Sequence, residues 1–260
     1  MGARQSTAKL GDPVKHPHPH PPKDPVYRAQ TPLELVHIDT SGPLSTGAWD
    51  GRKYWVVIVD DYSRKSWILL VRDKTEIPQR VKEWKVVIEA EAGSVIRKMR
   101  SDNGTKFTGA EFVQRMAEKR TSMETTAPGN PQSNGVAERM NRKLQERARS
   151  MMAETDLSPG GWRETVKCAS YMRKRRLVRG RGDKTPEVLW SGKVPSVRHM
   201  RAHGCKAFCE IEKIDRSSKL GVLAWEEVLL GYSETSPAYR IWDPRKKRVM
   251  NVGSPSFDSS

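Results

Sequence analysis

Cysteine, aromatic residues and long hydrophobic runs are all scarce in this chain of 260 residues. Three cysteines are too few for the disulfide framework of a small secreted protein, and they are typical of a reducing compartment. No apolar run approaches the ~18 residues that a membrane span needs, so we expect no contact with a membrane. Hydrophobic residues make up 36 % of the chain, which is low but adequate for one core of ~150 residues beside a smaller unit.

Acidic residues are also in short supply. The chain holds 47 Lys and Arg against 31 Asp and Glu, which gives a net charge of +16 and a pI near 9.9. An excess of this size favours binding to nucleic acid or another polyanion, because each contacted phosphate releases counterions. A well-solvated basic surface would give the same total, so charge alone does not decide between the two.

The order of the segments predicts the fold class. Residues 1–30 are rich in Pro, His and Lys, lack an apolar period, and are predicted to form a disordered arm. Three β-rich runs then follow between residues 33 and 73 with short links, which favours an antiparallel meander. Helix, strand, helix and short strand come next, and then helices over about 135–155 and 160–178. This order predicts an α/β domain of the ribonuclease-H-like type, with a mixed sheet and flanking helices.

Beyond residue 195 the pattern changes to short β-like runs separated by Gly, Pro and Asp turns. Runs of this kind predict a small all-β unit of roughly 60 residues. We therefore expect a core domain over residues 31–195 and a β domain over residues 196–260.

Three acids stand out by their positions. Asp39 lies inside the first predicted strand, Asp102 follows a later strand at a Gly turn, and Glu138 opens the long helix. A charge within a strand is costly to bury, and a strand end is a usual ligand position in an α/β sheet. Each acid alone fits an ordinary surface ion pair. Together they suit two Mg²⁺ ions ~3.5–4 Å apart, which take hard oxygen ligands and promote phosphoryl transfer.

Polar side chains continue from Glu138 along one face of the same predicted helix. Such a face would suit a DNA backbone lying beside metal ions, whereas an exposed helix with a Glu138–Arg142 pair is the plainer alternative. The residues on this face are Asn141, Arg142, Gln145 and Arg149.

A second basic stretch, "YMRKRRLVRGRGDK" over residues 171–184, holds seven Lys or Arg against one Asp. We favour contact with a DNA backbone here, by Lys174, Arg175 and Arg176. A nuclear-import signal or a solvated connector remain the alternatives.

Two other clusters contain residues that could bind a metal ion. Asp60 and Asp61 adjoin a strand end, where we expect a structural role. Four potential zinc ligands crowd into 11 residues, unlike the separated pairs of structural zinc sites, so zinc is not expected. The two cysteines among them would face the same side of a strand and belong to a core. These four residues are His199, His203, Cys205 and Cys209.

The spacing of the acids and the sequence stretches around them resemble those of one protein family. Asp102 and Glu138 are separated by 35 residues, as in the D,D-35-E signature of retroviral-type integrases. The stretches "HIDTSGP", "KYWVVIVDDYSRKSW", "RSDNG", "PQSNGVAERMNRKLQERARSMM", "TPEVLWSGKVPSV" and "LLGYSETSPAYRIWDP" resemble the integrase region of copia-type LTR retrotransposon Gag-Pol polyproteins. The resemblance covers roughly residues 30–258.

The resemblance implies a ribonuclease-H-like integrase catalytic core followed by an SH3-like domain. It implies an integrase, a polynucleotidyl transferase and endonuclease in which Asp39, Asp102 and Glu138 are the catalytic and metal-binding residues. Two Mg²⁺ ions, with Mn²⁺ as a substitute, would be the cofactors. The partners would be double-stranded DNA, as element ends and target, and further copies of the chain. The expected location is the nucleus, with a cytoplasmic particle stage.

Some positions depart from the family pattern. No cysteine precedes Cys168, so the zinc module that the family carries upstream of the core is not found here. Lys106 stands where the family usually has an acid, and "EKRTSME" and "YMRKRR" replace two familiar stretches. These departures raise an alternative, a catalytically decayed or domesticated nucleic-acid-binding remnant of a retroelement.

Overall fold

The computed structural model describes residues 27–45, 48–102, 110–118, 120–125, 135–155, 157–178, 182–210 and 224–258. Apart from its last four residues, the predicted arm over residues 1–30 lies outside these ranges. No helix in the described ranges is long and apolar enough to cross a membrane.

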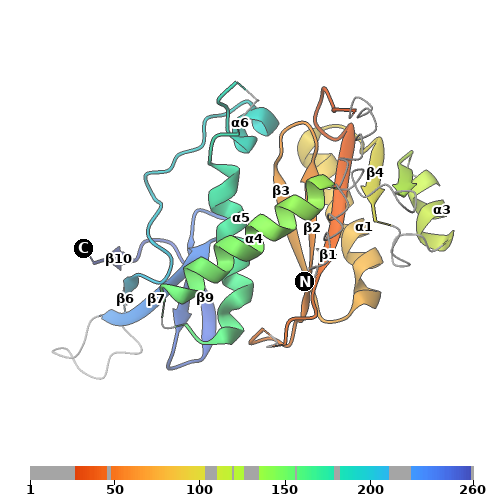
Figure 1. The fold of residues 1–260 in the computed structure, drawn as a ribbon. Helices are drawn as coiled ribbons and strands as arrows, with labels where there is room; N and C mark the ends of the chain where they lie inside the picture. The colour runs from red at the N-terminus through yellow and green to blue at the C-terminus, as the bar shows by residue number, and fades with distance from the viewer. Residues whose placement is uncertain are drawn as a thin grey trace, which may run out of the picture.

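Five strands form the first sheet in the spatial order β3-β2-β1-β4-β5 (Figure 1). Their bounds are β1 Leu35–Ser41, β2 Tyr54–Asp60, β3 Ser66–Val71, β4 Lys98–Ser101 and β5 Ser122–Thr125. The first three pair antiparallel through short links, whereas β4 pairs parallel with β1 and β5 parallel with β4. Parallel pairs need long crossovers, which α1 and α3 supply. The predicted mixed sheet is confirmed.

Two helices, α1 (Ile77–Ala92) and α3 (Ala110–Glu118), cover one face of this sheet. The apolar stripe of α1, with Val81, Trp84 and Ile88, packs in one core with the even-numbered residues of β1. The helix ends at Gly93, whose φ of 62° is the left-handed conformation that glycine adopts without strain at a helix end.

Helices α4 (Gly135–Ala153) and α5 (Trp162–Lys174) cover the opposite face. Val57 and Val59 of β2 pack there against Leu144 of α4. The second helix is shorter than predicted, because a 3₁₀ turn precedes it and the backbone leaves helical geometry at Arg175, with φ −105° and ψ 1°.

A second sheet follows, antiparallel throughout, with the strand order β10-β6-β7-β8-β9. Its strands are β6 Lys206–Glu210, β7 Ala224–Tyr232, β8 Tyr239–Asp243, β9 Arg248–Val252 and β10 Ser256–Phe257. A short helix, α6 (Pro186–Ser191), lies in the connection and was not predicted. The predicted all-β second part is confirmed, and Cys205 and Cys209 both pack in its core.

The second sheet lies directly on α5, so that α4 and α5 stand between the two sheets (Figure 1). Tyr232 of β7 belongs to the same apolar cluster as Cys168 of α5 and Val57 of the first sheet. Gly231 has a φ of 152°, and a Cβ at this position would lie 3.2 Å from the Cβ of Cys168. Glycine therefore permits the close approach of β7 to α5.

Candidate active site

Asp39 lies on the central strand of the first sheet and faces the layer of α4 and α5. It pairs with Val57, whose side chain packs against α4, and side chains at paired positions share a face. Asp39 is half-buried, and its Oδ2 accepts a hydrogen bond of 2.8 Å from Nδ2 of Asn141 on α4. The carboxylate is therefore held by the helix as well as by its own strand.

Asn141 links this carboxylate to the hydrophobic core. Its side chain is buried, and its Oδ1 accepts a hydrogen bond of 2.7 Å from Nε1 of Trp55. The indole N–H can only donate, so the amide oxygen must face Trp55 and the amide nitrogen must face Asp39. The fixed amide orientation therefore presents an N–H donor to the carboxylate of Asp39.

Asp102 stands next to Asp39 at the edge of the parallel pair. The register of β1 and β4 runs from Leu35 opposite Lys98 to Ile38 opposite Ser101, so Asp39 and Asp102 are the next positions on the two strands. Side-chain alternation turns Asp102 to the α4 face, because Met99 packs in the core on the opposite face. Asp102 is exposed to solvent.

Glu138 lies in the first turn of α4, three positions before Asn141, and is exposed. Residues three apart lie on the same side of a helix, so Glu138 is on the side that meets β1. Within the described residues, however, no group of three His, Cys, Asp or Glu side chains lies close enough to hold one metal ion. The structure brings Asp39 and Asp102 to neighbouring positions and does not bring Glu138 into a group with them.

The donor atoms fit a hard divalent cation. Asp39 and Asp102 offer carboxylate oxygens at one sheet edge, and Mg²⁺ is usually held by one or two carboxylates with several waters. An ion held by these two carboxylates would complete its shell with waters and a substrate oxygen.

The four polar residues predicted on α4 fall into two pairs. Asn141 is buried against Asp39, and Gln145 donates a hydrogen bond of 2.6 Å from Nε2 to Oγ of Ser41. Both therefore attach α4 to β1. Arg142 and Arg149 are exposed, and the Nε of Arg142 lies 4.0 Å from Oε1 of Glu146. Only this second pair is open to a DNA backbone.

The three consecutive cations of the second basic stretch have three different environments. Lys174 is buried and donates from Nζ to Oε1 of Glu234 at 2.7 Å. The guanidinium of Arg175 stacks 3.5 Å from the ring centre of Tyr171. Arg176 is exposed. The DNA contact predicted for all three stays a prediction, and Arg176 is the most exposed of them.

Glu164 is a buried acid that sequence reasoning missed. It accepts hydrogen bonds from Nε and Nη2 of Arg240 in β8, at 2.6 and 2.8 Å, and two more from Nε and Nη2 of Arg163. Burial alone would raise the pKa of Glu164, but the hydrogen bonds and charge of Arg240 hold that pKa below its usual value. A bidentate pair of this kind fixes the second sheet against α5.

Aromatic stacking supports the same contact at two further places. The rings of Trp49 and Trp242 stack at 3.9 Å between centroids, and those of Tyr171 and Tyr232 stack at 4.5 Å. Two histidines of the cluster at residues 199–209 also lie here. His199 bonds the hydroxyl of Tyr171 at 2.8 Å, and His203 lies 3.1 Å from Oγ1 of Thr165.

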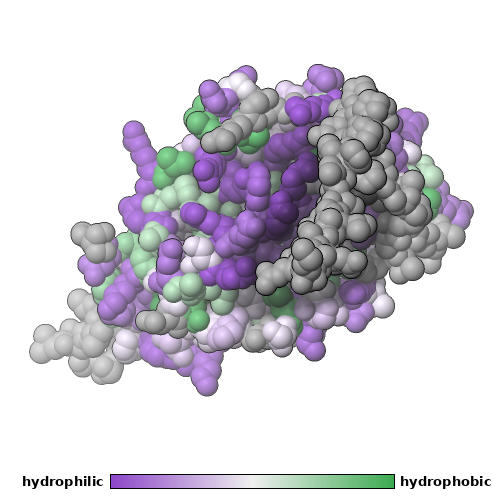
Figure 2. All heavy atoms as spheres, in the orientation of Figure 1, coloured by the Kyte–Doolittle hydropathy of each residue, from purple (hydrophilic) through white to green (hydrophobic). Residues whose placement is uncertain are grey.

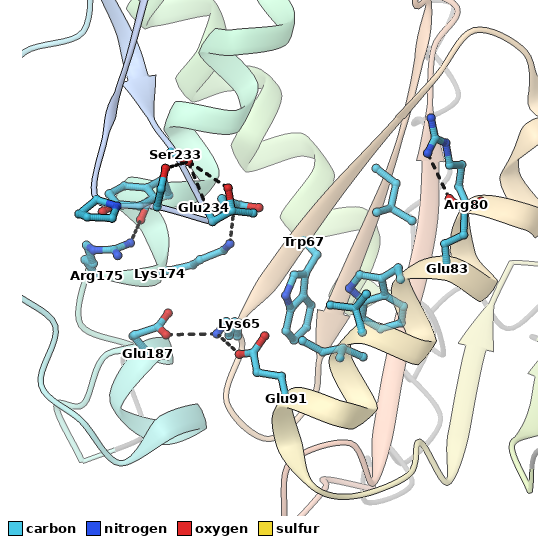
Figure 3. Close-up of a pocket in the computed structure, with 18 residues that line it drawn as sticks. Lys65, Trp67, Arg80, Glu83, Glu91, Lys174, Arg175, Glu187, Ser233 and Glu234 are labelled. Atoms are coloured by element: carbon cyan, nitrogen blue, oxygen red, sulfur yellow. Dashed lines mark hydrogen bonds and ion pairs between the residues drawn. The ribbon is translucent and has the colours of Figure 1, made fainter. Parts of the chain in front are cut away.

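A cleft of about 830 Å³ opens where α1, α5, α6 and the β7–β8 turn meet (Figure 3). Its charged residues neutralise one another. Lys65 lies between Glu91 and Glu187, at 3.3 and 3.1 Å, and Lys174 faces Glu234. These ion pairs neutralise the lysines of the cleft, so it offers little attraction for a charged ligand.

Asp60 and Asp61 are accounted for by their own hydrogen bonds. Asp60 accepts from the backbone N–H groups of Leu33 and Ser63, at 2.9 and 2.7 Å. Asp61 bonds His37 at 3.2 Å and pairs with Arg64 at 3.0 Å. Despite burial, which opposes ionisation, these partners lower the pKa of Asp61 to about 2. The structural role expected for both acids agrees with these contacts.

Two family models match the chain. Residues 29–131 match an integrase core domain, and residues 205–260 match a retroviral polymerase SH3-like domain. The first match contains Asp39 and Asp102, and the second contains all five strands of the second sheet and the loops between them.

Two of the curated relatives are polyproteins of plant transposons. The chain is 36 % identical over 228 residues to the retrovirus-related Pol polyprotein from transposon TNT 1-94 of Nicotiana tabacum, covering 88 % of the chain. It is 25 % identical over 209 residues to that of transposon RE1 of Arabidopsis thaliana, covering 80 % of the chain. The chain spans only 17 % and 14 % of these two polyproteins.

Among solved structures, the chain resembles one from a simian T-cell lymphotropic virus intasome, in complex with PP2A regulatory subunit B56 gamma. The TM-score is 0.55 at 16 % identity, over 91 % of this chain and 82 % of that one. At this identity the likeness concerns the fold, and it extends over both sheets.

Proposed function

This chain belongs to the integrase family of copia-type retrotransposon polyproteins, and we infer that it catalyses metal-dependent DNA strand transfer. In this reaction the 3′-hydroxyl of element DNA attacks a target phosphodiester. A new P–O bond forms as the P–O bond of the target strand breaks, and the target strand leaves with a free 3′-hydroxyl. Water in place of the attacking hydroxyl gives end nicking, so no covalent enzyme intermediate is needed.

Asp39, Asp102 and Glu138 would hold two Mg²⁺ ions, with Mn²⁺ as a substitute. Integrase core domains normally use divalent metal ions. When bound, the ions would activate the attacking oxygen and neutralise charge on the scissile phosphate and the leaving oxygen. Glu138 would complete the set from the first turn of α4.

The chain's own residues position these acids. Asn141 presents its amide N–H to Asp39 while Trp55 holds the amide oxygen, so the carboxylate is oriented before any ligand binds. Gln145 secures the next turn of α4 to Ser41 of β1. Since Glu138 is on the same helix, these two bonds also set its distance from the sheet edge.

The partners that follow from this proposal are double-stranded DNA and further copies of the chain. Exposed Arg142 and Arg149 lie on the helix that carries Glu138, where a phosphate backbone would pass. The related viral structure is an intasome, which supports a homo-oligomer acting on two DNA ends. We propose a nuclear location for the same reason, since the target duplex is there.

The observation that carries the proposal is the neighbouring placement of Asp39 and Asp102 on parallel strands, with Asn141 of α4 bonded to Asp39. Two carboxylates turned to the same side, at the edge where the catalytic helix meets the sheet, are a suitable start for a divalent-metal site.

A strand-transfer assay tests the proposal. Purified protein is mixed with a duplex carrying element ends and a supercoiled target, in Mg²⁺, in Mn²⁺ and in EDTA. We expect joined products in either metal, none in EDTA, and a loss of at least about 100-fold in Asp102→Asn. Asp183→Asn is the matched control, because Asp183 is an exposed acid outside the site.

Equal activity in wild type and Asp102→Asn would rule out the metal assignment. Duplex binding without any metal-dependent joining or nicking would instead support the decayed, DNA-binding remnant. The same preparation therefore separates the two functions.

A further inference from the structure

A groove between α4 and α5 lies on the other side of α4 from the candidate active site. It encloses about 830 Å³ and is lined by Lys143, Leu144, Arg147, Met172, Arg173 and Arg176. We call it the α4–α5 groove. Its floor is apolar, since Leu144 is buried and Met172 is half-buried, whereas its rim is cationic.

The rim carries charge that the protein does not neutralise. Within the ranges that the structure describes, no acid forms an ion pair with Lys143, Arg147, Arg173 or Arg176. The single acid on the lining is Glu146, and its carboxylate lies 4.0 Å from Arg142 instead. This is the reverse of the cleft near Lys65, where every lysine has an acid.

The cations are also close enough to oppose one another. Burial lowers the pKa of Lys143, and the charges of Arg173, Arg139 and Arg142 lower it further. Burial likewise lowers the pKa of Arg173, with a further contribution from Arg176. Cations held together in this way favour an anion that bridges them.

The cationic rim is continuous with the face of α4 that leads to Glu138. Arg139 and Arg142 are exposed on that face, between the groove and the first turn of the helix. Figure 2 shows hydrophilic side chains gathered along this strip of the molecule, over α4. A long polyanion could therefore follow the helix from the groove to the acids. A short acidic peptide bound in the groove alone would make no use of this continuous cationic strip.

We propose that the α4–α5 groove binds the phosphodiester backbone of a DNA duplex, at a distance from the scissile phosphate. The proposal rests on the proposed function in taking DNA as the ligand, but it does not require the metal site. Lys143, Arg147 and Arg176 make the phosphate contacts, and Arg173, which donates to Sδ of Met140 at 2.9 Å, stays within the groove wall.

The test is binding of a fluorescent 30-bp duplex in EDTA, followed by anisotropy from 50 to 300 mM salt. The variant is Lys143→Gln, Arg147→Gln, Arg176→Gln. Its matched control is Arg72→Gln, Arg80→Gln, Lys82→Gln, which removes the same charges near α1. The slope of log K against log salt is negative, and each lost phosphate contact reduces its magnitude by about 0.9. We expect this magnitude to fall by about 2 to 3 in the variant, with at least tenfold weaker binding at 100 mM salt, and to stay unchanged in the control.

Equal slopes for variant and control, in a wild type that binds the duplex, would overturn the groove assignment and leave the proposed function intact. A wild type that binds no duplex would overturn both. Poly-glutamate of equal charge is the competitor. Its ability to displace the duplex at equal charge concentration is compared in the wild type, the variant and the control. Displacement from the wild type and the control, but not from the variant, would show a site for acidic protein segments and overturn the DNA assignment.

Discussion

The two sides of helix α4 treat polar residues in opposite ways. Toward the first sheet, Asn141 and Gln145 are paired with Asp39 and Ser41. Toward α5, Lys143 and its neighbouring arginines line a groove whose one acid among the described residues, Glu146, lies 4.0 Å from Arg142. The difference teaches that one helix can serve two purposes. Paired groups hold the geometry of a site, and unpaired charges remain available for a ligand.

The ion pair between Glu164 and Arg240 is bidentate and buried, and breaking it should give the largest loss of unfolding free energy. Glu164→Ala leaves Arg240 without its acid beside a buried space, whereas Arg163 keeps its pair with Asp50. We expect the free energy of unfolding to fall by about 3–5 kcal/mol in urea denaturation. Glu226→Ala removes an exposed acid of β7 that pairs with Lys206, and should cost less than about 1 kcal/mol. Similar losses in the two variants would contradict the distinction.

Asn141→Ala breaks the paired side of α4 itself. It leaves the buried N–H of Trp55 without an acceptor and removes the hydrogen bond from Asn141 to Asp39. We expect a loss of about 1–3 kcal/mol in unfolding free energy. Strand transfer should fall about 100-fold, because this hydrogen bond no longer orients the carboxylate. Gln114→Ala, an exposed change on α3, serves as the control. Wild-type strand transfer in Asn141→Ala would show that Asp39 does not depend on the amide.

Acid should weaken the Glu164 contact by a smaller amount. The pKa of Glu164 in the folded protein lies below its usual value of 4.5, because Arg240 outweighs burial. Its contribution is therefore complete above about pH 4.5 and is lost as the pH falls through the lower, folded value. We expect the stability gap between wild type and Glu164→Gln to be constant from pH 7 to 5 and to narrow below pH 4.5. A gap that widens in acid would mean that the sign is wrong.

The smallest effect is expected on the unpaired side. Lys143→Gln removes a charge that its neighbours oppose, so the unfolding free energy should change by no more than about 0.5 kcal/mol, or rise slightly. Lys98→Gln removes a lysine that pairs with Glu124 at 3.0 Å, and should lower it slightly. Thermal denaturation of both variants gives the comparison, and a clear loss in Lys143→Gln would reveal a partner for this lysine.

Local pattern is sufficient for most of the helices and strands of the first sheet's layers, but not for the short helix α6. The meander, the helix that ends at Gly93 and the long helix from Gly135 follow from short-range periodicity and end signals, and the structure has all three. The neighbouring placement of Asp39 and Asp102 also follows, because a parallel pair joined through a crossover helix fixes which strand ends meet. Whether Glu138 joins them stays a prediction.

Partners distant in the sequence could not be predicted. Asn141 bonds Trp55 across 86 positions, and Lys174 bonds Glu234 across 60. Periodicity predicts the face on which each residue lies, but it does not predict which side chain from another element packs against it. Lys174 and Arg176 look alike in a basic run, yet one is buried by the second sheet and the other is exposed. Only tertiary packing separates them.

The close approach of Gly231 to Cys168 also sets a chemical reactivity. Burial beneath β7 raises the pKa of the Cys168 thiol to about 12, so almost none of it is thiolate at neutral pH. Alkylation must then wait until the second sheet lifts from α5. The rate at which Cys168 is alkylated would therefore report how often the second sheet separates from α5.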